Sequence, residues 1–406
     1  MTETAIKKKI LFVDDEFSIL SGLNRMLRGM REEWDMEFAQ GAEDALDLLS
    51  GTAFDVVVAD LRMPGMDGAD LLARVKEIHP RAVRIILSGH ADRNVILKTV
   101  LPAHQFLTKP CDAHELKSAV HRACSLQKML ADERLTGLVS QIDRIPALPA
   151  AYMQLMDLLQ QPECTIKQVG DLMSTDIGMS AKILQVVNSS FFGVPRHVSN
   201  PAQAVGLLGL ETLRALVLML GVFSKFDSAI ISAVPLDTLQ NHCMQTAAIA
   251  RDIALLENLG NRQVDYLFMA GILHDVGKLV LAQYLPEAYQ NVLEMAHTTG
   301  MPISESEQAL LGAGHAEIGG YLMGIWGLPD DIVQIIAFHH RPNLVPEEFR
   351  KSTLILSIAN WLQHREEGNI IHPEPDWPLM NQVGSYDHLP RWIEIAHTVS
   401  RRKRDE

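Results

Sequence analysis

Short apolar runs, separated by intervals of helix length, recur through the first third of the chain. The runs are Ile10-Leu11-Phe12-Val13, Met36-Glu37-Phe38-Ala39, Val56-Val57-Val58, Ile85-Ile86-Leu87 and Gln105-Phe106-Leu107. Each has the length of a buried strand, and the first interval places Leu20, Leu23 and Leu27 at helical spacing. Strands that alternate with helices in this way predict an α/β fold with a doubly wound, five-stranded parallel sheet over about residues 8–124.

Polar side chains follow these runs where the strands are expected to end. They are Asp14, Asp15, Asp60, Ser88 and Lys109. Ligands of doubly wound sheets bind at the carboxyl ends of the strands, so these side chains are expected to converge. Because clustered carboxylates need a divalent cation to stay ionised, the cluster suits aspartyl-phosphate chemistry. Each residue alone could instead be a helix cap, a turn residue or a solvated lysine, but their joint placement at strand ends makes coincidence improbable.

The remainder of the chain predicts a second, all-α domain. From Pro146 onward the sequence shows helix-length amphipathic stretches cut by Gly, Pro and Asn, without the alternation of a strand. A length of 406 residues and a hydrophobic content of 47% also favour two domains over one core. Between them, residues 116–142 have the apolar spacing of one or two amphipathic helices. This linker could be a passive spacer or a signalling or dimerising helix, because periodicity does not distinguish the two.

The bulk composition argues against several classes of partner. The net charge of -14 does not favour a nucleic-acid binder, and the basic runs Lys7–Lys9 and Arg401–Arg404 are short and terminal. The longest apolar stretch, Ala215–Phe223, is far shorter than the ~20 residues of a membrane span. No signal-peptide pattern precedes the first strand, and the four cysteines form no CxxC pair. We therefore expect a cytoplasmic protein with neither a nucleic-acid nor a membrane partner.

The order and spacing of Asp14-Asp15, Asp60, Ser88-Gly89 and Lys109-Pro110 resemble those of a response-regulator receiver domain, with its flavodoxin-like fold. The resemblance covers about residues 8–124 and implies that Asp60 is the phosphoacceptor. It also implies that Asp14, Asp15, Asp60 and the backbone carbonyl of Arg62 hold Mg²⁺, and that a sensor histidine kinase or phosphotransfer protein is the partner.

The same resemblance assigns roles to three further residues. Lys109 would contact the phosphoryl oxygens as a cation, and Ser88 would hydrogen-bond the phosphate once it is formed. Phe106, where the family often has Tyr or Phe, would turn inward as Ser88 moves. A Phe at a strand end is also common core packing, so that alternative for Phe106 stays open.

Histidines mark a second constellation in the helical part. His274-Asp275 lies in a helical segment, and His242, His315, His339 and His340 are further candidates. Imidazole nitrogens with a carboxylate suit Zn, Mn, Fe or Ni. The order of these residues resembles that of the HD superfamily of metal-dependent phosphohydrolases. Each histidine alone would more often be an ordinary core or surface residue.

Upstream motifs indicate which HD branch the chain resembles. The segments 145–149, 176–184, 188–193 and 204–209 look like the HDOD domain, the HD-related output domain, and the resemblance runs from about residue 145 to 340. HDOD domains are helical regulatory modules for which enzymatic activity is generally not established. The Asn-Ser and Gly-Leu-Leu-Gly elements within these segments could also be simple helix ends and close helix packing.

Three departures weaken the case for catalysis. The related HD-GYP phosphodiesterases have a Gly-Tyr-Pro loop after their paired histidines, but here Arg341-Pro342 follows. Thr238 stands where that branch has a glutamate ligand, and Asn360 stands at the closing aspartate position. A neutral amide is a weaker ligand than a carboxylate for a hard cation, so a transition metal in this domain is an open alternative.

We therefore expect a receiver domain at residues 1–124, a linker helix at 125–144, an HDOD domain at 145–345 and a helical C-terminal extension at 346–406 packed on it. The predicted function is a response regulator in which Mg²⁺-dependent phosphorylation of Asp60 controls an HDOD output that binds an unknown downstream protein. The alternatives are a phosphorylation-controlled HD-type phosphohydrolase acting on a cyclic dinucleotide or other phosphoester, and a phosphorylation-dependent homodimer.

Overall fold

The computed structural model describes residues 7–89, 105–109, 116–117, 119–120, 154–155, 158, 164–174, 183–184, 187, 198, 201–223, 226, 234–326, 328–369 and 371–404. The chain divides into two compact units, one mainly formed by residues up to Ser140 and one mainly by residues from Gln141 onward. Each is described by itself. None of the described helices is both long and apolar enough to cross a membrane.

The N-terminal unit contains the predicted parallel sheet. Its strands are β1 (Lys8–Val13), β2 (Trp34–Ala39), β3 (Val56–Asp60), β4 (Val83–Gly89) and β5 (Gln105–Lys109). They pair in the order β2-β1-β3-β4-β5, and every pairing is parallel. The order reverses between β1 and β3, so the carboxyl ends of these two strands flank the crevice where doubly wound sheets bind ligands.

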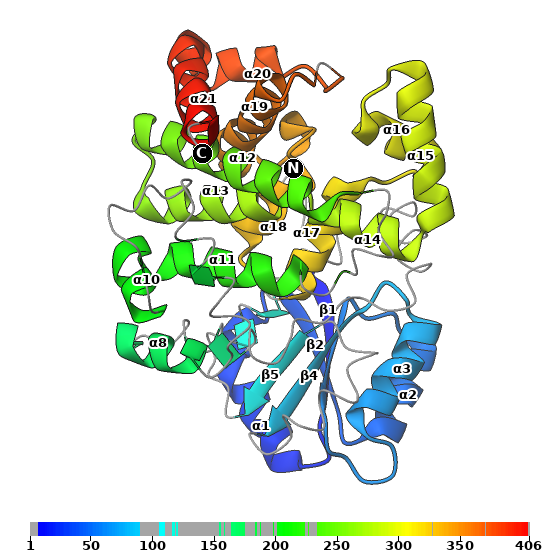
Figure 1. Ribbon diagram of the computed structural model, residues 1–406. Coiled ribbons are helices and arrows are strands. Elements are labelled where there is room, and N and C mark those ends of the chain that lie inside the picture. The colour runs from blue at the N-terminus through cyan, green and yellow to red at the C-terminus, as the bar shows by residue number, and fades with distance from the viewer. Residues whose placement is uncertain are drawn as a thin grey trace. The chain divides into compact units, whose positions relative to one another are not determined.

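Both faces of the sheet are buried, which explains the continuous apolar runs in the sequence. Leu11, Val13, Val57 and Ala59 share a core with α2 (Ala42–Gly51) and α3 (Gly68–Ile78), which lie on one side of the sheet in Figure 1. Because side chains alternate along a strand, the intervening residues face the other side, and Ile10, Phe12, Val56 and Val58 are also fully buried. Helix α1 (Phe17–Met26) and a 3-10 turn, η1 (Arg28–Met30), follow β1.

In the described residues after Lys109, the regular elements are all helical, as predicted. The first are α8 (Ile166–Ser174), α10 (Pro201–Leu208), α11 (Leu210–Phe223), α12 (Leu236–Leu256), α13 (Asn261–Leu273), α14 (Val276–Tyr284) and α15 (Pro286–Thr299). They are followed by α16 (Ile303–Leu311), α17 (His315–Ile325), α18 (Asp330–Ala337), η3 (Pro342–Leu344), η4 (Glu347–Phe349), α19 (Arg350–Glu366), α20 (Trp377–Gln382), η5 (Tyr386–His388) and α21 (Leu389–Arg404). The α/β and all-α classes are thus confirmed.

Helix α12 is the central element of the helical unit. Helices α13, α19 and α21 all pack against it. Helix α13 approaches closely because Gly271 has no side chain: a Cβ there would lie 2.5 Å from the Cα atom of Ala247 in α12. Helix α21 is anchored by the buried Trp392, whose Nε1 donates a hydrogen bond to Glu257 Oε1 over 3.2 Å. Helices α19 and α21 of the C-terminal part therefore lie beside α12.

Several sequence predictions fall on residues outside the described part of the chain. The predicted linker helix at 125–144 is one of them. The motif residues 145–149, 176–182 and 188–193 are others. The structure does not test these predictions.

Candidate functional site

Two carboxylates and one ammonium group meet at the carboxyl edge of the sheet. Asp60 ends β3, Asp14 directly follows β1 and Lys109 ends β5. The Lys109 Nζ atom lies 2.7 Å from Asp14 Oδ2 and also forms an ion pair with Asp60 Oδ1. Asp14 is 1% exposed and Asp60 8% exposed. The sequence-predicted residues Asp14, Asp60 and Lys109 therefore share one buried contact.

Backbone groups hold both carboxylates in place. The Asp60 Oδ2 atom accepts a hydrogen bond from the backbone N–H of Arg62 over 3.0 Å. Asp14 Oδ1 accepts one from Glu16 N over 2.9 Å. Gly68 begins α3 directly against the strand end, where a Cβ would lie only 2.0 Å from the Asp60 carbonyl oxygen. Helix α3 can therefore start beside Asp60 only because residue 68 lacks a side chain.

The charges at this edge favour a bound cation. Burial raises the pKa of the Asp60 carboxyl; the hydrogen bond and charge of Lys109 oppose this rise, whereas the charge of Asp14 adds to it. Burial would lower the pKa of Lys109, but its bonds to Asp14 and Asp60 raise it overall. Two carboxylates against one ammonium leave excess negative charge among hard oxygen donors. This donor set fits Mg²⁺.

The structure describes the other predicted receiver residues, Asp15, Ser88 and Phe106, in less detail. Asp15 is half-buried next to Asp14, and its carbonyl accepts a hydrogen bond from Gln40 Nε2 over 3.2 Å. Ser88 lies in β4 opposite Thr108, and Phe106 lies in β5 opposite Ile86. The side chains of Ser88 and Phe106 are outside the described part of the structure. Their predicted switch roles stay predictions.

The six predicted residues of the helical unit converge; we call His242, His274, Asp275, His315, His339 and His340 the HD cluster. His242 lies in α12 and His315 begins α17, but the His274-Asp275 pair, predicted to lie within a helix, lies in the turn between α13 and α14. The ring centroids of His274 and His339 lie 5.1 Å apart, and those of His242 and His274 lie 5.5 Å apart. His315 Nε2 lies 3.2 Å from Asp275 Oδ1 and 3.0 Å from His340 Nε2. All but the half-buried His340 are buried.

Backbone and carboxylate partners fix the tautomers of three of these histidines. The Nδ1 atoms of His274 and His339 lie 2.7 Å from the carbonyl oxygens of Gly271 and Ile336, so each Nδ1 carries the proton. Their Nε2 atoms are buried and have no hydrogen-bond partner among the described residues. His315 Nδ1 lies 2.6 Å from Glu307 Oε2, which likewise directs its Nε2 toward the cluster. Unprotonated Nε2 atoms backed by such partners, as in His274 and His339, are the usual form of metal-binding histidines.

The HD cluster is poor in negative charge. Burial lowers the pKa of His274 to about 4 and holds those of His339 and His340 well below 6.5. Burial would raise the pKa of Asp275, but the charges of Lys278 and His274 lower it well below 3.8. The Lys278 Nζ atom lies 2.6 Å from Asp275 Oδ2. The single carboxylate of the cluster is thus ionised and already has a cationic partner.

Other residues of this region were not foreseen from the sequence. Glu307, Lys278, His364, Glu367 and His372 all lie at the HD cluster or beside it. Asn360 was singled out as a departure from the family pattern, and its Oδ1 lies 2.9 Å from His242 Nε2. The spacing of Asn360 and His364, one helical turn apart, was a signal that could have indicated a shared helix face.

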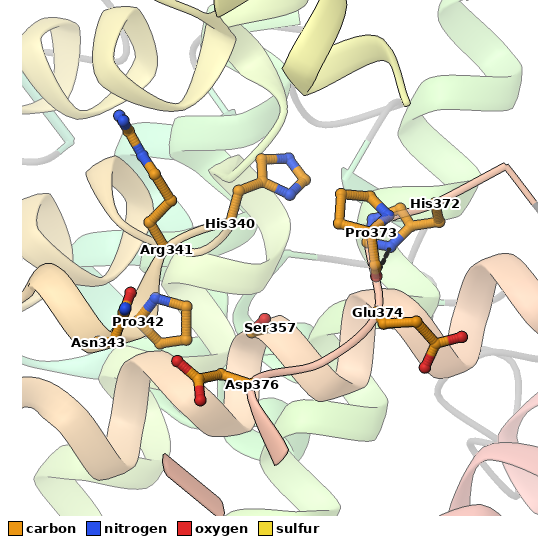
Figure 2. Close-up of a pocket in the computed structure, with 9 residues that line it drawn as sticks. All are labelled: His340, Arg341, Pro342, Asn343, Ser357, His372, Pro373, Glu374 and Asp376. Atoms are coloured by element: carbon orange, nitrogen blue, oxygen red, sulfur yellow. Dashed lines mark hydrogen bonds between the residues drawn. The ribbon is translucent and has the colours of Figure 1, made fainter. Parts of the chain in front are cut away.

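A pocket of about 240 Å³ opens beside the cluster. Figure 2 shows His340 on one side of it and His372 on the other, and their ring centroids lie 5.5 Å apart. Arg341, Ser357 and Asp376 also line it. The pocket gives small molecules or ions a route from the surface to His340.

Comparisons with known proteins agree with this architecture. The profile of the response regulator receiver domain matches residues 10–121, and that of the HDOD domain matches residues 145–342. A crystal structure of an HDOD domain protein with unknown function from Geobacter sulfurreducens superposes with a TM-score of 0.53 at 23% identity. It covers 67% of this chain and 89% of that one, and at this identity it shows the fold alone.

Two curated relatives match this chain over different lengths. The DNA-binding transcriptional regulator NtrC of Escherichia coli K12 is 39% identical over 114 residues, which are 28% of this chain and 24% of NtrC. An uncharacterised protein from Treponema pallidum is 26% identical over 225 residues, 55% of this chain and 43% of that protein. The chain thus spans less than half the length of these relatives. It belongs to the two-component response regulators and joins a receiver domain to a C-terminal HDOD domain of the HD superfamily.

Proposed function

We propose that phosphorylation of Asp60 by a sensor histidine kinase or phosphotransfer protein controls the HDOD domain, which acts by binding a downstream protein. One observation carries this proposal: the buried carboxylates of Asp60 and Asp14 meet at Lys109. Asp14, Asp15, Asp60 and the carbonyl of Arg62 would hold Mg²⁺. When bound, the ion supplies positive charge that offsets the charge on the transferring phosphoryl group.

The residues at the sheet edge divide the work of phosphoryl transfer. An oxygen of the Asp60 carboxylate attacks phosphorus, the P–N bond of a phosphohistidine donor breaks, and the imidazole leaves and takes up a proton. Lys109 already contacts Asp60 Oδ1 and is placed to neutralise an oxygen of the incoming group. Ser88 would then bond the phosphate, and Phe106 would follow its movement, as the resemblance to receiver domains implies.

The new charge must alter the helical domain for the signal to pass. A phosphoryl group adds about -1.5 to -2 charge at the sheet edge, which can bias a two-state element. The linker at 125–144 is the candidate for that element, either as a signalling helix or as the pairing surface of a homodimer. We place the protein in the cytoplasm because it resembles response regulators.

Intact-mass spectrometry tests the phosphorylation step. The full chain is incubated with acetyl phosphate, with and without Mg²⁺. The wild type should gain the mass of one phosphoryl group only with Mg²⁺, whereas Asp60→Asn should gain none. Asp47→Asn, which removes an exposed carboxylate of α2, is the control and should be labelled like the wild type. Equal labelling of wild type and Asp60→Asn would contradict the proposal.

A second candidate function, HD-type phosphohydrolysis, is favoured by the Nε2 atoms of His274 and His339, which have no hydrogen-bond partner in the described part of the chain. With His315 and Asp275 they would hold a first-row transition metal, which supplies a Lewis acid for water activation. Asn360 and Thr238, in place of acidic ligands, and the lack of a Gly-Tyr-Pro loop argue against it. The test is hydrolysis of a cyclic dinucleotide by the metal-loaded chain. Activity that His339→Ala abolishes would support this function, and no turnover in the loaded wild type would reject it.

A further inference from the structure

Three side chains that follow the family-matched segment join His242 on the surface side of the HD cluster. His364 lies in the last turn of α19, Glu367 caps this helix, and His372 precedes α20. All three follow residue 342, where the HDOD match ends. The ring centroids of His242 and His364 lie 4.4 Å apart, as do those of His364 and His372.

A chain of hydrogen bonds fixes the proton of His242. His372 Nδ1 lies 3.0 Å from the carbonyl oxygen of Pro373 and therefore carries a proton. Its Nε2 must then accept a hydrogen bond from Asn360 Nδ2, 3.4 Å away. This orients the Asn360 amide so that its Oδ1 faces His242 Nε2 at 2.9 Å. His242 Nε2 is therefore the protonated nitrogen, and a neutral His242 presents a lone pair at Nδ1.

His364 has the same tautomer for an independent reason. Asn369 Oδ1 accepts a hydrogen bond from the backbone N–H of Ile371 over 3.0 Å, which fixes the orientation of this amide. Its Nδ2 then points to His364 Nδ1 at 3.3 Å, so His364 Nδ1 is an acceptor. Both imidazoles thus present an unprotonated Nδ1.

Both Nδ1 atoms lie close to the carboxylate of Glu367. His242 Nδ1 lies 3.2 Å from Glu367 Oε2, and His364 Nδ1 lies 3.7 Å from the same oxygen. Gln363 Nε2 supports the carboxylate by donating to Oε1 over 2.9 Å. The Nδ1 lone pair of His242 and the Glu367 carboxylate repel each other at this separation, so a proton or a metal cation between them is stabilising.

The separations match the coordination sphere of a metal ion. Zinc bonds of 2.0–2.1 Å in a tetrahedron place neighbouring ligand atoms about 3.4 Å apart, between the two observed distances. One ligand atom from each of His242, His364 and Glu367 can be chosen so that all lie within 4.8 Å of one another. The Glu367 side chain is 37% exposed, so an ion can enter from solvent and keep a water ligand.

We propose that His242 Nδ1, His364 Nδ1 and Glu367 form a binding site for a first-row divalent transition metal ion, of which zinc is the test case. The bound ion would displace the Asn369 bond to His364 and join α12 to the end of α19. This extension site shares His242 with the HD cluster, whose other candidate ligands are the Nε2 atoms of His274, His315 and His339. Metal binding at the extension site does not depend on phosphorylation of Asp60.

Zinc binding by the chelator-treated full chain tests the extension site. In a His339→Ala background, which removes a ligand of the HD cluster, one zinc ion per chain should still bind by titration calorimetry. Adding His364→Ala or Glu367→Gln should weaken this binding by more than about tenfold. Adding His397→Ala, an exposed histidine on α21, should leave it unchanged.

Cobalt(II) provides the second readout, because its visible absorption reports on nitrogen and oxygen ligands. The spectrum of the His339→Ala protein should change on adding Glu367→Gln, which alters an exposed side chain and should leave circular dichroism and the melting temperature of the apoprotein intact. The proposal is overturned if the His339→Ala protein binds no zinc, or if His364→Ala and Glu367→Gln bind it as tightly as their parent.

Discussion

The Nζ atom of Lys109 lies 2.7 Å from Oδ2 of Asp14, with the Lys109 side chain 25% exposed and that of Asp14 only 2% exposed. Lys109 also pairs with Asp60, so it balances part of the charge of two buried carboxylates at once. Removing it leaves them to repel each other without this ammonium group between them.

We therefore predict that Lys109→Met lowers the free energy of unfolding by about 1–3 kcal/mol in chelator at neutral pH. Urea unfolding followed by circular dichroism measures this. Added Mg²⁺ should recover part of the loss, because the ion supplies the missing positive charge. A variant as stable as wild type in chelator would show that Lys109 does not balance these carboxylates.

The raised pKa of Asp60, caused first by its burial, predicts a pH effect. A carboxyl whose folded-state pKa exceeds its ordinary value of 3.8 holds its proton more tightly in the folded state. Its contribution to stability is present below that value and is lost as pH rises through the raised pKa. Asp60→Asn stays neutral, so in chelator its stability relative to wild type should increase with pH and then level off. Unfolding across a pH series checks this, and a wild type that gains stability over the variant as pH rises would contradict it.

Gly68 predicts a steric effect at the same edge. An added Cβ would lie 2.0 Å from the Asp60 carbonyl oxygen, so Gly68→Ala must displace β3 or the start of α3. We expect a loss of about 1–3 kcal/mol and slower labelling by acetyl phosphate. Gly22 in α1 is the matched control, because nothing lies within 4 Å of its Cβ position. Gly22→Ala should instead stabilise the protein by about 0.5–1 kcal/mol, and equal effects of the two changes would reject the steric argument.

The sheet edge could be predicted because strand geometry is regular. Parallel strands end together, so polar residues after the runs at Val13, Ala59 and Leu107 had to converge whatever the helices between them did. The partnership of Lys109 with Asp14 follows from the same rule. The position of Gly68 against Asp60 could not be predicted, because it depends on how closely α3 approaches the strand end.

No comparable geometric rule predicts which residues meet in the helical unit. The HD cluster was predicted from the order of its histidines in a known superfamily, since periodicity alone does not place one helix beside another. Glu307, buried in α16, was missed because a lone glutamate in a helix usually faces solvent. His364 and Glu367 were missed because only the packing of α19 on α12 brings them to His242.

Lys278 allows a prediction of how strongly the folded state depends on an ammonium group beside the HD cluster. Its Nζ lies 2.6 Å from Asp275 Oδ2; Lys278 is 13% exposed and Asp275 fully buried. Lys278→Met would leave this carboxylate without its lysine partner in the core, at a cost of about 3–5 kcal/mol in the metal-free protein. Lys351→Met is the matched control: Lys351 is 39% exposed, and its partner Glu257 keeps bonds to His388 and Trp392, so the cost should stay below about 1 kcal/mol. Urea unfolding of both variants measures the difference, and a Lys278→Met protein no less stable than Lys351→Met would mean that Asp275 is neutral in the folded state.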